Sequence, residues 1–274
     1  MRHAPSKELG QHFLVDENIL GVIDRLAELA RDDVVLEVGA GFGVLTRYLA
    51  ERVAWVHAVE IDRALAPALE EGLAGSDNIA LRFEDALVLD ARSLEPPPTK
   101  LVANLPYTIA TPLVVESLDG LPTVAHWCVM VQREVADRFF ARTGTKAYGA
   151  VSVLLQLVAR RTGFHPVSRT AFRPRPHVDS ALVAFRRRTD PPASYPAVKR
   201  LVAAAFAHRR KTLVNSLQLA GLVPRERAAA ALAALRLPAD VRAEALSPGE
   251  FVRLAELLGE AGDRSDPPSG GETG

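Results

Sequence analysis

The chain has 274 residues, of which 48% are hydrophobic, and its acidic and basic residues are equal in number. This length holds one large α/β domain with a smaller second domain. No apolar stretch approaches the ~20 residues that a membrane span needs, and no secretory signal follows Met1. A single cysteine excludes an internal disulfide, and no Cys/His cluster has metal-ligand spacing. We therefore expect a cytoplasmic, monomeric protein without a metal and without membrane contact.

Hydrophobic periodicity divides the chain into an α/β part and a helical part. Strand and helix patterns alternate up to a final strand at 180–185, which predicts a mostly parallel, doubly wound sheet. An amphipathic helix is expected at 17–31, with Asp16 as its cap. Beyond the Pro-rich linker at 190–192, helical patterns follow at 195–207, 211–219, 225–235 and 248–258. The expected divisions are an N-terminal arm (1–16), an α/β domain (17–189), a helical domain (190–261) and a disordered tail (262–274).

A glycine-rich turn lies between the first strand and the first helix of this α/β part. The apolar run 34–38 is followed by Gly39-Ala40-Gly41-Phe42-Gly43 and then by residues at helical spacing. Strand, glycine turn and helix begin a nucleotide-binding unit, in which glycines let a ligand approach the backbone. A second strand ends in Glu60-Ile61-Asp62, about 20 residues after the glycines, where a carboxylate can accept from ribose hydroxyls.

The spacing of the turn narrows the choice of nucleotide. Position 44 is Val, so the pattern is G-x-G-x-G and not the dinucleotide fingerprint, and the Gly-Lys-Ser/Thr ending of a P-loop is missing. Glu37 places negative charge where a pyrophosphate would be repelled and an amino-acid ammonium attracted. This pattern resembles the S-adenosylmethionine site of class I methyltransferases. In such enzymes an acidic residue at the third strand end, here Asp85-Ala86, faces the adenine amino group; alone, Asp85 would be a turn residue or cap.

The tetrad Asn104-Leu105-Pro106-Tyr107 follows the buried run 101–103. Pro106 stiffens the turn and favours an extended Leu105, whose carbonyl can then project into a site. An Asn amide oxygen and a backbone carbonyl suit an exocyclic amino group with two hydrogens to donate. Tyr107 offers a flat face to an aromatic ring. The alternative is a strand-ending turn with an Asn cap.

Basic residues are concentrated late in the chain. Residues 1–100 hold 10 Lys or Arg against 18 Asp or Glu, whereas 101–189 hold 12 against 5. Two clusters, Arg186-Arg187-Arg188 and Arg209-Arg210-Lys211, bracket the predicted domain junction. Such clusters predict contact with a polyanion, here RNA, while a solvated or packing face is the alternative.

Further motifs occur in a fixed order along residues 7–258. They are Leu9-Gly10-Gln11-His12-Phe13-Leu14-Val15-Asp16, the tetrad at 104–107, Gln132-Arg133-Glu134-Val135-Ala136, Phe172-Arg173-Pro174-Arg175-Pro176-His177-Val178-Asp179-Ser180-Ala181 and His208-Arg209-Arg210-Lys211-Thr212-Leu213-Val214-Asn215-Ser216-Leu217. Together they resemble the ribosomal RNA adenine N6,N6-dimethyltransferase family, most closely its small-subunit branch. His12 departs from the Asn usual in bacterial members.

The resemblance implies a class I, Rossmann-like methyltransferase fold with a small all-α C-terminal domain. It implies dimethylation of adenine N6 from S-adenosylmethionine, at two adjacent adenines in the 3′-terminal hairpin of small-subunit ribosomal RNA, and a role in ribosome biogenesis. The implied catalytic residues are Asn104, Leu105, Pro106, Tyr107 and Phe172, with the two aromatic rings holding a flipped-out base. The implied cofactor contacts are Gln11, His12, Leu14, Gly39, Gly41, Glu60, Ile61, Asp85, Ala86 and Asn104.

Three alternatives remain open. The macrolide-resistance branch acts on large-subunit RNA, tends to have Ile at position 105 and usually lacks the Arg-Arg-Lys-Thr-Leu segment. Adenine-N6 DNA methyltransferases typically show Pro-Pro-Tyr after the Asp or Asn, whereas position 105 here is Leu. A ribosome-assembly factor without catalytic activity would need only the basic clusters.

Overall fold

The computed structural model describes residues 11–260, so the predicted tail (262–274) and most of the predicted N-terminal arm lie outside the described residues. The chain forms two compact units. The first contains the residues up to 137 together with 159–188, and the second contains 138–158 together with the residues from 189 onward. The expected α/β domain of residues 17–189 differs from this division at 138–158. This segment carries a helix, α6 (Ala150–Val158), that packs against helices of the second unit.

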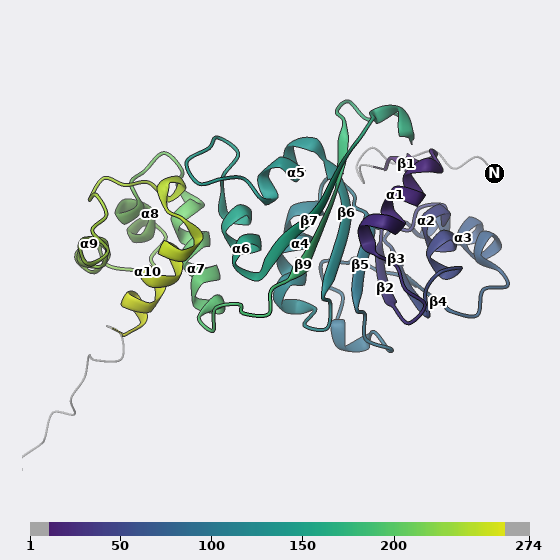
Figure 1. Cartoon of the computed structure of the whole chain (residues 1–274), viewed down its shortest axis with the longest axis horizontal. Coiled ribbons are helices and arrows are strands. Elements are labelled where there is room, and N and C mark those ends of the chain that lie inside the picture. Colours follow the sequence, from purple (N-terminus) through teal and green to yellow (C-terminus); the bar gives the residue numbers. More distant parts are fainter. Residues whose placement is uncertain (1–10, 261–274) are drawn as a thin grey trace, which may run out of the picture. The chain divides into compact units, whose positions relative to one another are not determined.

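A seven-stranded sheet forms the centre of the first unit, in the order β4-β3-β2-β5-β6-β9-β7 (Figure 1). The first five strands in this order, from β4 to β6, are parallel to one another. Strand β9 is antiparallel to both of its neighbours, β6 and β7. Their bounds are β2 (Val34–Val38), β3 (Trp55–Glu60), β4 (Ile79–Phe83), β5 (Lys100–Asn104), β6 (His126–Gln132), β7 (Ala159–Val167) and β9 (Ser180–Arg187). The chain runs outward from β2 to β4 and then returns to β5, so the sheet has its topological switch point between β2 and β5, where α/β folds bind ligands. The predicted doubly wound, mostly parallel sheet is confirmed.

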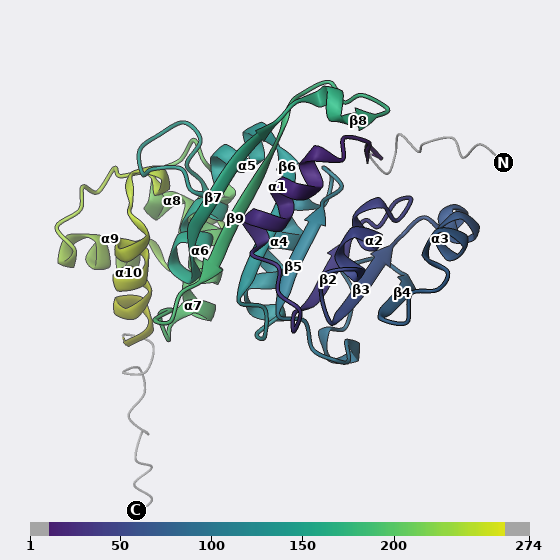
Figure 2. The same cartoon turned by 45° about the vertical axis from the view of Figure 1, so that its right-hand side comes forward.

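Helices cover both faces of this sheet, as Figure 2 shows for α1 and α4. One face packs against α1, α2 and α3 through a continuous apolar core. The other face packs against α4, where Trp127 Nε1 of β6 donates to Ser117 Oγ at 3.0 Å. The helical elements of this unit are α1 (Asn18–Ala27), α2 (Val44–Ala50), the short η1 (Arg63–Leu65), α3 (Ala66–Leu73), η2 (Ala91–Ser93), α4 (Ala110–Gly120), the start of α5 (Arg133–Phe139) and η3 (Arg169–Ala171).

The first helix is shorter than the predicted 17–31. The N-cap residue is Glu17, which makes no capping hydrogen bond through its side chain, so the predicted cap at Asp16 is wrong. The Asp16 carboxylate lies just before the helix and accepts the Asn18 N–H at 3.0 Å. At the other end Glu28 adopts a left-handed conformation (φ 50°), and the Asp33 carboxylate accepts the Ala30 N–H at 2.6 Å. These contacts end the helix and direct the chain toward β2, although the helical pattern of the sequence continues to residue 31.

The second unit is a helical cluster around Tyr148 and Phe251, whose side chains are fully buried. The Tyr148 hydroxyl donates to the Leu246 carbonyl at 2.8 Å, and Ser216 Oγ donates to the Ala204 carbonyl at 2.8 Å. Besides α6, this unit contains α7 (Tyr195–Ala207), α8 (Leu213–Leu219), α9 (Arg225–Ala234), η4 (Ala243–Ala245) and α10 (Pro248–Glu260). Among residues 11–260, no helix combines the length and the apolar character needed to cross a bilayer.

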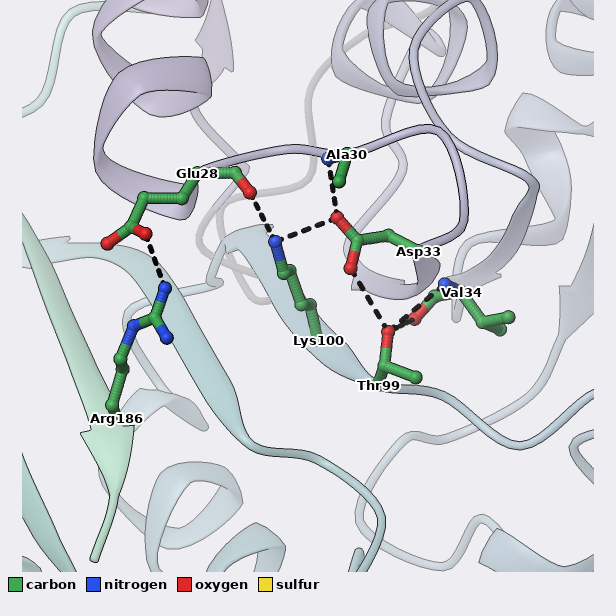
Figure 3. A network of polar contacts seen from close by, with 7 residues as sticks. All are labelled: Glu28, Ala30, Asp33, Val34, Thr99, Lys100 and Arg186. Carbon is green, nitrogen blue, oxygen red and sulfur yellow. Dashed lines mark hydrogen bonds and ion pairs between the residues drawn. The ribbon is translucent and has the colours of Figure 1, made fainter.

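A polar network fastens the end of α1 to the sheet at the edge where the parallel strands begin (Figure 3). Lys100 Nζ lies 2.7 Å from Asp33 Oδ2 and also donates to the Glu28 carbonyl. Thr99 Oγ1 donates to the Val34 carbonyl at 3.2 Å, which ties β2 to the residue before β5. The Arg186 guanidinium of β9 pairs with the Glu28 carboxylate. One of the arginines predicted to bind RNA therefore has an acidic partner within the protein.

Arg187, also predicted to bind RNA, has a structural role. Its guanidinium donates to the carbonyls of Leu118, Leu121 and Val124 at 2.7, 3.0 and 2.8 Å, and it lies 4.9 Å from the centre of the Trp127 ring. The planar fork of arginine suits such a set of acceptors. The sequence Arg186-Arg187-Arg188 does not reveal which arginine has a structural role. Successive side chains of a strand point to opposite faces of the sheet, so these neighbouring arginines have different surroundings.

We expect Arg187→Gln to lower the free energy of unfolding by about 2–4 kcal/mol, because the carbonyls of Leu118, Leu121 and Val124 lose their charged donor. Denaturant unfolding followed by circular dichroism measures this loss. Arg160→Gln removes an exposed arginine from the same sheet and should change stability by less than about 0.5 kcal/mol. Equal losses in the two variants would contradict the structural role.

Candidate active site

The glycine turn after β2 is held against the end of β3. The N–H groups of Gly39 and Ala40 donate to the Val59 carbonyl at 2.8 and 3.3 Å. The Gly41 N–H donates to Glu60 Oε2 at 2.9 Å. These bonds fix the turn at the switch point of the sheet and leave its upper surface open to a ligand.

Glycine is required at two positions of this turn for reasons of conformation and of space. Gly39 has φ 82°, and a Cβ there would lie 3.1 Å from Pro106 Cδ. Gly41 has φ 59°, and a Cβ there would lie 2.9 Å from the Phe13 ring. Both φ values belong to the left-handed region that other residues rarely adopt. The turn can therefore approach both the tetrad and the N-terminal segment closely.

Glu60 lies at the centre of the cofactor side of the site and is only 5% exposed. Besides its bond to the Gly41 N–H, its other oxygen, Oε1, accepts the Asp62 N–H at 2.9 Å. Asp62 Oδ2 in turn accepts from Gln11 Nε2 at 2.8 Å. The end of β3 thus holds the glycine turn on one side and the N-terminal segment on the other.

Two adjoining hollows open above these groups and share Gly39, Glu60, Ile61 and Pro106 in their walls. The first has about 730 Å³ of space including its open mouth, and the second about 480 Å³. All the residues predicted to contact a cofactor lie around them: Gln11, His12, Leu14, Gly41 and Asn104 line the first, Asp85 and Ala86 the second, and Gly39, Glu60 and Ile61 both.

Two aromatic residues of the first hollow were missed by the sequence analysis. Phe13 and Phe42 line its wall, and their ring centres are 4.5 Å apart at an angle of 53°. Both stand inside motifs that were noted, Phe13 beside His12 and Phe42 between two glycines. Their positions within those motifs could have indicated that they line the site, but only the fold brings the two rings together.

The tetrad stands at the end of β5, beside the first hollow. Asn104 Nδ2 donates to the His12 carbonyl at 3.1 Å, and the Leu105 N–H donates to the Met130 carbonyl at 3.0 Å. The first bond orients the Asn104 amide, so that its Oδ1 is the end left to accept from a ligand. The second bond fixes the peptide of Leu105, whose side chain is 1% exposed. Within residues 11–260, no backbone N–H donates to the Leu105 carbonyl.

Tyr107 is fixed at both ends of its side chain. Its hydroxyl hydrogen-bonds to Ser180 Oγ at 2.6 Å, and its ring centre lies 5.4 Å from that of His12. The His12 ring is itself oriented, because Nδ1 lies 2.8 Å from the Pro174 carbonyl and donates to it. Burial raises the pKa of the Tyr107 phenol, so it stays neutral at ordinary pH. A half-buried, oriented and neutral ring can stack with a base.

The structure does not expose Phe172, which the sequence analysis placed against the second face of a base. Its side chain is 0% exposed and belongs to the same apolar core as Leu14. It lies in β8 (Phe172–Arg173), which pairs with β1 (Phe13–Leu14), with Leu14 opposite Phe172. Core and stacking aromatics look alike in a sequence, and the β1–β8 pairing decides between them here. We therefore omit Phe172 from the base site.

Glu37 is a buried carboxyl in the wall of the first hollow, only 1% exposed. Its Oε2 has no hydrogen-bond partner among the described residues. Burial raises the pKa of this carboxyl to about 8, and the charge of Glu60 adds to the rise. A buried acceptor without a partner, next to Gly39, fits the ammonium of an amino-acid moiety, as the sequence analysis expected.

Comparison with known proteins assigns these features to a family. A family model described as ribosomal RNA adenine dimethylase matches residues 2–260. The chain belongs to this family. It is 50% identical over 250 residues to a "Ribosomal RNA small subunit methyltransferase A" of Rubrobacter xylanophilus, a match that covers 91% of this chain and 94% of the relative. A protein of the same name from Thermobifida fusca is 46% identical, with 92% and 90% covered.

Solved structures agree with this membership. The crystal structure of the 23S rRNA methyltransferase ErmE matches 90% of this chain and 99% of its own, with 33% identity and a TM-score of 0.64. A dimethyladenosine transferase from Plasmodium falciparum has the same fold, with a TM-score of 0.77, 24% identity and 92% and 98% covered. The chain is thus a ribosomal RNA adenine methyltransferase that uses S-adenosylmethionine. The unpaired Glu37 oxygen and the close glycine turn fit that cofactor.

The buried Glu37 makes the stability of the cofactor-free protein depend on pH. Its pKa is raised from 4.5 to about 8 in the folded protein, so between these values the unfolded chain ionises while the folded protein does not. The contribution of Glu37 to stability is therefore most favourable below pH 4.5 and is lost progressively as the pH rises to 8. Glu37→Gln should remove this loss, which is on the order of 4–5 kcal/mol.

Urea unfolding at pH 5, 6.5 and 8 measures this effect. The control is Glu70→Gln, on an exposed position of α3, which should keep the pH dependence of the unchanged protein. A Glu37→Gln protein that loses stability with pH as steeply as the unchanged protein would refute the prediction.

Glu60→Ala should weaken binding of S-adenosylhomocysteine by roughly 1–3 kcal/mol, because a charged acceptor is removed. The variant also loses the anchor of the Gly41 N–H, so calorimetry is combined with a melting curve to show that it is folded. Glu71→Ala, at an exposed position of α3, is the matched control. Unchanged affinity in a folded Glu60→Ala protein would remove this residue from the cofactor site.

Proposed function

We propose that this enzyme dimethylates N6 of two adjacent adenines in the 3′-terminal hairpin of small-subunit ribosomal RNA, within the subunit or its precursor. The names of relatives that are 50% and 46% identical over nearly the whole chain support the small subunit as target. Leu105 and the Arg209-Arg210-Lys211 segment, which distinguish the small-subunit branch in sequence, support the same choice.

The likeness to ErmE makes a 23S target the second candidate. Purified small and large subunits from cells that lack this methylation separate the two. We expect radiolabelled methyl groups from S-adenosylmethionine to enter small-subunit RNA, with two methyl groups on each modified adenine. Labelling of large subunits alone would favour the second candidate, and binding to subunits without any labelling would favour an assembly factor.

The observation that carries the catalytic proposal is the orientation of the Asn104 amide by the His12 carbonyl. With Nδ2 engaged there, Oδ1 accepts one N6 hydrogen of the target adenine, and the Leu105 carbonyl accepts the other. The N6 lone pair is delocalised into the ring and is therefore a weak nucleophile. Two acceptors for its two hydrogens favour a tetrahedral nitrogen and direct the lone pair toward the methyl donor.

The other residues of the base site, such as Tyr107, position the base and do not exchange protons with it. Reaction at N6 requires the adenine to leave its stack, and Tyr107 offers one face on which it can rest. When bound, S-adenosylmethionine supplies an electrophilic methyl group whose thioether leaving group needs no acid. We propose that the proton of N6 passes to water after transfer.

We expect Asn104→Ala to fold and to bind S-adenosylhomocysteine and RNA almost normally, while methyl transfer falls by several orders of magnitude. The reason is that the Asn104 amide stabilises the transition state more than it strengthens binding. Single-turnover transfer and the melting temperature are measured on the same preparation. Asn104→Asp is a useful companion, because it keeps acceptor oxygens but removes the donor to His12. An Asn104→Ala protein that is destabilised yet active would identify Asn104 as a turn cap only.

The RNA-binding proposal rests on Arg209, Arg210 and Lys211, which are all exposed in the segment between α7 and α8. Residues 207–211 surround a hollow of their own, and Arg209 Nη2 donates to the Tyr148 carbonyl at 3.2 Å, which holds the segment in place. Arg188 is exposed as well and remains part of the proposal, whereas Arg186 would have to exchange Glu28 for a phosphate.

Changing Arg209, Arg210 and Lys211 together to Ala should weaken RNA binding and lower its salt dependence by about one unit of log–log slope for each phosphate that is no longer bound. Cofactor affinity should stay the same. Filter binding at several salt concentrations measures the slope. The triple change Arg142→Ala, Lys146→Ala and Arg253→Ala removes equal charge from exposed positions of the same unit. Identical slopes for the two triple variants would mean that the segment is a solvated face.

A further inference from the structure

The segment that joins β7 to β9, residues 168–179, carries basic side chains beside the candidate active site. Arg169, Arg173, Arg175 and His177 are exposed there, against a single acidic residue, Asp179. They belong to the same unit as Asn104 and Tyr107.

Two contacts place this segment beside the base site. The Pro174 carbonyl accepts from His12 Nδ1 at 2.8 Å, and the His12 ring lies 5.4 Å from that of Tyr107. Ser180, the first residue after the segment, hydrogen-bonds to the Tyr107 hydroxyl at 2.6 Å. The segment therefore contacts His12, the neighbour of Tyr107, and ends at the residue before the one that bonds Tyr107.

The arginines of the segment differ in what they bind. Arg169 braces the segment, because its N–H donates to Asp179 Oδ1 at 3.0 Å and its Nη1 to the His177 carbonyl at 3.2 Å. Arg173 Nη1 donates only to the adjacent Phe172 carbonyl, at 3.3 Å. For Arg175, no hydrogen bond or ion pair occurs within residues 11–260. Arg173 and Arg175 flank Pro174 and offer cationic groups to a ligand.

The backbone that carries these two arginines is held before any ligand arrives. Arg173 pairs with Phe13 in the β1–β8 ladder, Pro174 is bonded to His12, and Pro176 is buried. Each proline also fixes its own φ. Little backbone entropy is then given up when the guanidinium groups bind, which favours a defined contact over a diffuse one.

We propose that Arg173 and Arg175 bind the phosphates on either side of the target adenosine. The proposal rests on the function proposed above and adds how the target is presented. The base stacks on Tyr107, and its own strand continues in both directions over the segment. Arginine suits phosphate because its fork can donate two parallel hydrogen bonds. The ligand is thus a nucleotide within a continuous RNA strand, and a free adenosine would lack this contact.

The first test compares Arg173→Gln/Arg175→Gln with the matched control Arg25→Gln/Arg92→Gln, whose arginines are exposed in the same unit outside this segment. The probe is the small subunit purified from cells that lack this methylation. We expect KM for this substrate to rise about 10- to 100-fold in the first variant, with a log–log salt slope lower by about one to two units. The control should keep both values. A KM equal to that of the control would overturn the proposal.

The second test replaces the phosphates on the two sides of the target adenosine with uncharged methylphosphonates. The unchanged enzyme and the control variant should lose activity on this RNA by a similar factor. The Arg173→Gln/Arg175→Gln variant should show no further decrease, because it already lacks the groups that bind these phosphates. Equal losses in all three proteins would overturn the proposal.

Calorimetry with S-adenosylhomocysteine tests the remaining explanation, which is that the two arginines bind the cofactor and not the RNA. We expect Arg173→Gln/Arg175→Gln to keep its affinity for this compound. A fall in affinity would place the arginines at the cofactor carboxylate and would overturn the proposal. Failure of the function proposed above gives a different result, since the unchanged enzyme would then leave the RNA of purified small subunits unmethylated.

Discussion

The carboxylate of Glu60 is the group on which the arrangement of the active site depends. It is buried at the end of β3 and accepts one N–H from the glycine turn and one from Asp62. The turn is thereby held where a ligand can approach its backbone, and Asp62 holds the N-terminal segment through Gln11. That segment presents the His12 carbonyl to Asn104, so one charged group connects the cofactor side of the site to the tetrad.

The site contains two buried carboxyl groups, Glu60 and Glu37, which differ in their hydrogen-bond partners. Glu60 has backbone donors on both oxygens, whereas Glu37 is buried with one oxygen unpaired among the described residues and has a raised pKa. Leaving a buried carboxyl without a partner is costly for folding. We expect the ammonium of the bound cofactor to supply the missing partner. The cofactor-free protein would then be less stable, while its affinity for the cofactor would be higher.

The arginines of this chain divide according to their partners. Arg187 stabilises the sheet through three carbonyls, and Arg186 fastens the end of α1 through Glu28. Arg210 and Lys211 are exposed in one unit, and Arg173 and Arg175 in the other. Arg175, Arg210 and Lys211 can exchange water for phosphate without breaking a hydrogen bond within residues 11–260, and Arg173 would give up only its bond to the adjacent Phe172 carbonyl. Net charge, which is zero for the whole chain, conveys none of this distribution.

Local patterns were enough to predict much of the fold and of the site. Strands, the glycine turn, Glu60 and the tetrad at 104–107 follow from short-range alternation and turn chemistry, and α7 begins and ends where its periodicity predicted. These features are decided within a few neighbouring residues. Only the tertiary structure decided the burial of Phe172, the three carbonyls around Arg187 and the grouping of α6 with the second unit. Each depends on partners distant in sequence, such as Leu14 for Phe172 and Leu118 for Arg187, and a local pattern carries no information about which distant segment will pack there.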